Sequence, residues 1–203
     1  SGMYKDAAER LARCDTAMSK VFLLKCFFAL REVERFKEEL LDAFSKKMNG
    51  PGVGSMCSRG ALRFREDFKN PFCKFPLDYV YHCNLLNEVD FDAEFTTPVI
   101  GLLNSEPISE RSQGLIVNSK QTSGNIFSLA NSKIDNIQAI LRAEIEKYRL
   151  SFMNSTEGIF TGWPIAYKLK GWVLQMSSGG HITPHIHEGG WISGGVYINV
   201  PGD

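Results

Sequence analysis

The chain has 203 residues, of which 43% are hydrophobic and 23% charged, a composition typical of one ordinary globular domain. Basic and acidic residues both number 23, which leaves no overall positive field to attract nucleic acid, so we expect no nucleic-acid partner. The most apolar stretch, residues 21–30, contains Lys25 and is far shorter than the about 20 apolar residues that cross a bilayer, so no membrane function is expected.

The first residues predict a helix at a domain boundary. Ser1 and Gly2 precede Met3 and resemble a cleavage scar from an expression tag. Residues 4–16 carry small and apolar side chains at helical spacing, which predicts a helix there. We therefore expect a boundary segment at residues 1–18 and a single domain at residues 19–203.

A strand and a helix are predicted next. The β-branched and aromatic run from Val21 to Leu24 favours a strand. The following segment has apolar residues three and four positions apart, which predicts an amphipathic helix that Gly50-Pro51 ends. The apolar positions are Val33, Phe36, Leu40, Leu41 and Phe44.

The middle of the chain predicts less structure. Residues 57–121 mix short apolar runs with Pro, Asn and Gly, which favours short strands and long loops. Ser132 followed by Asp135 resembles a capping box, and a helical apolar stripe continues from Ile134 toward Phe152. A helix is therefore predicted from Ser132 onward.

From Trp163 the apolar period changes to two. Residues 166–177 are strand-like, and Gly179-Gly180 breaks them from a second extended run. Strands that follow helices favour an α+β fold that is mainly β, with helices at its N-terminal end.

Three of the four histidines lie in the second extended run. On a strand, His181, Thr183, His185 and His187 would share one face, opposite Ile182, Pro184 and Ile186. Residues two apart on a strand have Cα atoms about 6.6 Å apart, so the imidazoles of His185 and His187 can reach one metal ion. A His-x-His pair on a half-exposed strand is also often only solvated, and this alternative stays open.

A polar wall is predicted on both sides of the Gly189-Gly190 turn. His181 lies about twice as far from His185 as His187 does, which favours a place at the rim of the site, where it could contact the substrate. Beyond the turn, Ser193, Tyr197 and Asn199 share one face of a predicted strand, and the opposite face is apolar.

This region resembles the 2-oxoglutarate- and iron(II)-dependent oxygenases whose signature combines a Gly-Gly pair, Pro-His-x-His, Gly-Trp-x-Ser-Gly, a tyrosine-containing strand and Val-Pro. The matching residues are Gly179-Gly180, Pro184 to His187, Gly190 to Gly194, Tyr197 and Val200-Pro201. Residues 121–127 and the opening at residues 21–24 resemble further segments of the family. Its members often follow tetratricopeptide arrays.

The resemblance implies a double-stranded β-helix, or jelly roll, that holds Fe(II) through His185 and His187 as the catalytic metal ligands. It implies 2-oxoglutarate as cosubstrate and a hydroxylase reaction on a small-molecule or protein substrate. Tyr197, Gln175, Ser193 and Asn199 are candidates to bind the keto acid, and Trp191 and His181 to contact the substrate. Trp191 is equally well read as a core aromatic residue.

Two features differ from the family pattern. The common triad is His-x-Asp with a distant His, whereas His187 fills the acid position here; Glu188 is an alternative ligand only if the following turn rotates it. The family's further histidine and its carboxylate-binding arginine lie downstream of the Val-Pro strand, and the chain given stops at Asp203. We therefore expect a longer natural protein, and we interpret His82 as a packed or surface residue.

Five cysteines without a Cys-x-x-Cys pair argue against both a disulfide framework and a thiolate zinc site, and favour a reducing, cytoplasmic compartment. Two other function classes stay open beside the dioxygenase. One is a cupin-like metal protein without oxygenase activity, and the other is an inactive jelly-roll interaction module. The oligomeric state is also open, and a homo-oligomer is one alternative.

Overall fold

The computed structural model describes residues 2–105, 114–187 and 189–200, which divide into two compact units. Unit 1 combines residues 1–80 with residues 152–163 and 187–193, and unit 2 contains the rest of the chain. This division into units does not test the predicted domain boundary at residue 18, which stays a prediction.

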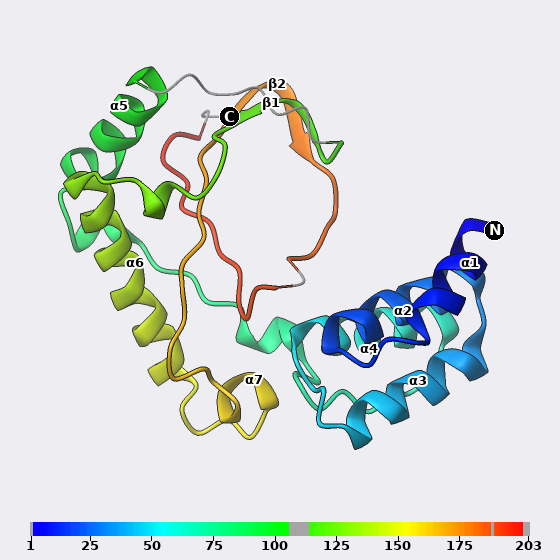
Figure 1. Ribbon diagram of the computed structural model, residues 1–203. Coiled ribbons are helices and arrows are strands. Elements are labelled where there is room, and N and C mark those ends of the chain that lie inside the picture. The colour runs from blue at the N-terminus through cyan, green and yellow to red at the C-terminus, as the bar shows by residue number, and fades with distance from the viewer. Residues whose placement is uncertain (1, 106–113, 188, 201–203) are drawn as a thin grey trace. The chain divides into compact units, whose positions relative to one another are not determined.

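Unit 1 is built around four helices (Figure 1), which are α1 (Gly2–Leu11), α2 (Ala17–Leu30), α3 (Val33–Ser45) and α4 (Pro51–Phe64). Helices α1, α3 and α4 all pack against α2. The core between them includes Leu24, Phe36 and Met56, none of which exposes any surface. A short helix, α7 (Gly158–Thr161), also belongs to this unit.

Helix α2 replaces the predicted strand at Val21–Leu24. Its start is a capping box, in which the Ser19 N–H donates to Thr16 Oγ1 at 3.1 Å and the Thr16 N–H donates to Ser19 Oγ at 3.0 Å. Because three helices surround it, α2 is apolar on several sides and shows no helical periodicity in its sequence. A short apolar run in a buried helix looks the same as one in a buried strand.

Other helical predictions are confirmed in part. Helices form where α1 and α3 were expected. Gly50-Pro51 does follow α3, but it also begins α4, since proline favours the first position of a helix. The predicted helix at Ser132 is α6 (Ser132–Ser151), and its cap is Asn131, whose side chain accepts the Lys133 N–H at 3.0 Å.

Unit 2 places α5 (Thr97–Ser105) and α6 around an apolar core that includes Phe95, Ile134 and Ile137. Its short helices are η2 (Leu85–Asn87), η3 (Asp92–Thr96) and η4 (Ile126–Ser128), while η1 (Pro76–Tyr79) belongs to unit 1. The strands β1 (Ile116–Gln121) and β2 (Leu174–Ile182) pair antiparallel in a two-stranded sheet (Figure 1).

The predicted mainly β jelly roll is wrong. Across the described residues the structure is mostly helical, with a sheet of two strands. Two apolar runs of the kind expected in strands, at residues 21–24 and 98–103, lie in α2 and α5. At the C-terminal end only Leu174–Ile182 pairs as a strand, whereas residues 166–173 and 192–200 do not. Among the described residues, no helix combines the length and the apolar character needed to span a membrane.

Candidate metal-binding segment

Strand β2 leads directly into the His-x-His segment. Its last residues, His181 and Ile182, pair with Val117 and Ile116 of β1. The Thr183 N–H then donates to the Leu115 carbonyl at 2.9 Å, which extends the pairing by one residue. Pro184 has no N–H to donate, so backbone pairing ends before His185.

A bulge in β2 sets the register of these residues. Ser119 pairs with Met176, but Val117, two residues away, pairs with His181, so the four residues 177–180 of β2 lie opposite the single residue Asn118 of β1. Gly179 in this bulge has φ +71°, and a Cβ on Gly180 would lie 2.7 Å from the Asn118 carbonyl oxygen. The two glycines therefore do not interrupt the strand, as the sequence predicted, but allow a bulge inside it.

Backbone and side-chain hydrogen bonds together continue the pairing before β2 begins, where the Thr122 N–H donates to the Val173 carbonyl and the Ile126 N–H donates to the Gly171 carbonyl, both at 3.0 Å. Thr122, which is buried, accepts the Val173 N–H through Oγ1 at 3.0 Å. Asn125 accepts the Gly171 N–H at 2.8 Å and donates to the Leu169 carbonyl at 3.2 Å. Residues 121–127 were predicted only by their resemblance to a family segment, although Thr and Asn commonly bond backbone groups in this way.

The rings of His181 and His185 each contact a carbonyl two residues earlier. His185 Nδ1 lies 2.8 Å from the Thr183 oxygen, and His181 Nδ1 lies 3.3 Å from the Gly179 oxygen. A carbonyl oxygen can only accept, so each contact requires an Nδ1–H group. In the neutral ring, Nε2 is then the atom with a lone pair for a metal, an arrangement common among metal-binding histidines.

His187 is exposed and lies outside any helix or strand. The predicted placement of His185 and His187 on one strand face does not apply, because β2 ends at Ile182. Two residues of chain nonetheless span at most about 7 Å, so the covalent spacing alone keeps both imidazoles within reach of one ion. The alternative ligand Glu188 lies outside the described residues.

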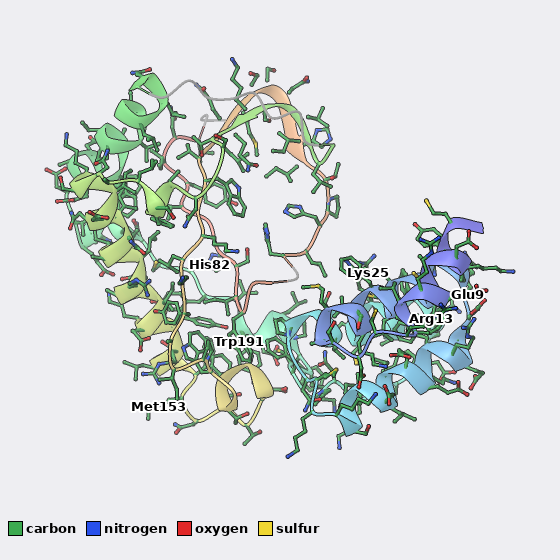
Figure 2. All side chains as sticks on the ribbon, in the orientation of Figure 1. Glu9, Arg13, Lys25, His82, Met153 and Trp191 are labelled. Atoms are coloured by element: carbon green, nitrogen blue, oxygen red, sulfur yellow. The ribbon has the colours of Figure 1, made fainter. Side chains whose placement is uncertain are left out.

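The donor chemistry of the segment fits part of an Fe(II) site. Two neutral imidazoles are suitable iron ligands, and the Nδ1–H contact of His185 places the lone pair of a neutral ring on Nε2. In the part of the chain that the structure describes, no three His, Cys, Asp or Glu side chains gather closely enough to hold a metal. His82, labelled in Figure 2, is exposed, as expected of a surface residue.

Trp191 is anchored inside unit 1. Its side chain is labelled in Figure 2. Its Nε1–H donates to the Ile159 carbonyl at 2.9 Å, and its ring meets the Phe72 ring edge-on with centroids 5.1 Å apart. Trp191 also lines an open pocket of about 400 Å³ together with Lys47, Asn49, Pro71 and Thr161. These contacts support the interpretation of Trp191 as a packed aromatic residue.

The candidates for binding the keto acid belong to both units. Gln175 is exposed in β2 and pairs with Lys120, and Ser193 is exposed in unit 1. Tyr197 exposes 84% of its surface and Asn199 is exposed, whereas Val196 and Ile198 pack against the core of unit 2. The predicted alternation of polar and apolar residues is thus present here without a strand, while the binding roles stay predictions.

Comparison with known proteins gives one finding. A model of the family described as "Putative 2OG-Fe(II) oxygenase" matches residues 170–203, a stretch that contains β2 and both His185 and His187. The family's description implies Fe(II) and 2-oxoglutarate. No curated protein and no solved structure matched the chain. The chain is therefore similar to this family over the segment that follows Leu169.

Proposed function

We propose that the chain contributes the metal-binding segment of an Fe(II)- and 2-oxoglutarate-dependent dioxygenase that hydroxylates its substrate. The observation that carries the proposal is the family match over residues 170–203, which includes the His185–His187 pair. The Nδ1–H contact of His185 with the Thr183 carbonyl adds independent support, since it selects Nε2 as the metal-binding atom.

With Fe(II) and 2-oxoglutarate bound, one atom of O2 would be used to oxidise the keto acid to succinate and CO2. The other atom of O2 would be inserted into a C–H bond of the substrate. His185 and His187 would hold the metal through neutral imidazoles, with no negative charge from the chain. The full charge of the ion would then attract an anionic keto acid more strongly than a site that contains Asp.

The remaining roles extend the same proposal. Tyr197, Gln175, Ser193 and Asn199 would supply hydrogen bonds to the keto acid, and His181 would contact the substrate. Trp191 would contact a substrate only through its ring, because its Nε1–H already donates to Ile159. The five free cysteines of the chain support a reducing, cytoplasmic location.

The test is an anaerobic titration of the full-length natural protein with Fe(II) and 2-oxoglutarate. A visible absorption band that requires both reagents is expected, and exposure to O2 should then release succinate. The matched controls are His185→Ala, which should remove the band, and His82→Ala, which should keep it. A chain that binds Fe(II) through His185 yet gives neither the band nor succinate would contradict the oxygenase proposal and leave only metal binding.

A further inference from the structure

Two arginines on helix α4 of unit 1 stack on the same aromatic ring. The Cζ atom of Arg63 lies 4.4 Å from the centroid of the Phe28 ring, and that of Arg59 lies 5.0 Å from it. Phe28 in turn meets Phe64 edge-on at 5.8 Å, and Phe64 contacts Phe36, which exposes no surface. The guanidinium groups are therefore held against a rigid aromatic base.

Neither arginine has an acidic partner within the described part of the chain. Glu32, which precedes α3, pairs with Arg35 at 2.7 Å, and Glu66, which follows α4, pairs with Lys37 at 3.1 Å, so these two carboxylates already serve other cations. Like charges four residues apart on a helix repel each other. The C-terminus of α4 attracts the positive charge of Arg63, but Arg59 lies a full turn earlier.

An exposed leucine completes this surface. Leu62 exposes 84% of its surface and lies three residues after Arg59, beside it on the surface of α4, and one residue before Arg63. We call Arg59, Leu62 and Arg63 the α4 patch. It presents two cations about one helical turn apart with an apolar side chain beside them.

We propose that the α4 patch binds an acidic peptide segment of a partner protein, with carboxylates one helical turn apart and an apolar side chain that covers Leu62. Each flat guanidinium can form paired hydrogen bonds with a carboxylate. A partner helix with acidic residues at i and i+4 has the complementary spacing. This surface is independent of the proposed oxygenase function.

The patch fits nucleic acid less well. Binding of single strands uses open aromatic rings on which bases stack, whereas Phe28 is only half-exposed and is covered by two guanidinium groups. A phosphate backbone also offers nothing apolar to cover Leu62. The overall charge balance of the chain adds no attraction for a polyanion.

The test measures fluorescence anisotropy of a fluorescein-labelled peptide made of Glu and Leu, with Glu at every fourth position, as the full chain is added. The double variant R59Q/R63Q should weaken binding about tenfold or more, because arginines are frequent hot spots. The matched control R10Q/R13Q removes two exposed arginines of the same unit, one in the last turn of α1 and one just after it, and should change affinity less than about twofold.

A second variant keeps both cation–π contacts. Leu62→Asp places a negative charge in the patch at an exposed position, and it should also weaken binding about tenfold, whereas Met3→Asp on α1 should not. Equal losses from the patch variants and their controls would overturn the proposal. Tighter binding of a single-stranded DNA than of the peptide, with loss in the same patch variants, would overturn the choice of partner.

Discussion

The Nδ1 atom of His185 lies 2.8 Å from the carbonyl oxygen of Thr183, two residues earlier in the chain. Thr183 itself is held by its N–H, which donates to the Leu115 carbonyl at 2.9 Å. The ring orientation of His185 therefore depends on the pairing of the chain just beyond β1 and β2. This relationship leads to the first prediction.

Replacement of His185 or His187 by Ala should reduce divalent-metal affinity about tenfold or more, because each change removes one of two neighbouring ligands. His187→Asp should keep measurable affinity, since a carboxylate also binds iron(II). Isothermal titration with Co(II) as a redox-stable probe measures the constants. His82→Ala is the control, and a comparable loss in that variant would show that the metal binds elsewhere.

Gly180→Ala should lower the free energy of unfolding by about 1–3 kcal/mol, because the added Cβ would lie 2.7 Å from the Asn118 oxygen and 2.8 Å from the Ser177 oxygen. Both neighbours are backbone atoms that cannot turn away. Urea unfolding followed by circular dichroism measures the change. Gly195→Ala is the matched control, since a Cβ there meets nothing within 4 Å, and equal effects would disprove the crowding at Gly180.

Trp191→Phe should cost about 1–2 kcal/mol of unfolding free energy, because it removes the N–H that the buried Ile159 carbonyl accepts. The smaller phenylalanine ring would keep part of the contact with Phe72. Tyr197→Phe, at a position 84% exposed, should stay within about 0.5 kcal/mol of the parent chain. A loss at Tyr197 that equals the loss at Trp191 would contradict the packing described here.

Acid should destabilise unit 1 through Asp42. Hydrogen bonds from Lys20 and Lys46 lower the pKa of Asp42 below its ordinary value of 3.8. The unfolded chain therefore takes up this proton first, so the stabilisation is present above about pH 4 and is lost as the pH falls through the lowered pKa.

The measurement compares the free energy of unfolding of the parent and of Asp42→Asn at pH 6 and pH 3. The difference between the two proteins should shrink at pH 3, where the native carboxylate begins to lose its charge advantage. Asp6→Asn, at an exposed position on α1, is the control. A difference that is the same at both pH values would show that Asp42 does not contribute through its charge.

Sequence patterns predicted the amphipathic helices well. The Val33 to Phe44 stripe and the stripe from Ile134 appear as α3 and α6, because each helix covers a core with one face only. The prediction of a strand at Val21 to Leu24 was wrong because the surrounding helices bury α2 on several sides. The capping box of Thr16 and Ser19 was a local signal that could have identified that helix.

Periodicity of two was a weaker guide. Val196 and Ile198 do face the core of unit 2 while Tyr197 does not, yet these residues pair with no strand. An alternating pattern reports which side chains are buried, whereas strand formation also needs a partner for the backbone hydrogen bonds. The His-x-His pair could be identified from the sequence because chelation needs only its covalent spacing, but its ring contacts depend on β1.

The hydrogen bonds of Asn125 to Gly171 and of Leu115 to Thr183 fix the chain on both sides of the bulge in β2. The bulge already takes up a difference in length between the two strands, while His181 and Ile182 beyond it keep their pairing with β1. An added residue between Thr183 and His185 has no such reservoir, and it would separate the imidazole from the carbonyl that orients it. For engineering, an extra residue is best inserted in the bulge ahead of Gly180. The three paired residues that follow the bulge, 181–183, are best left unchanged.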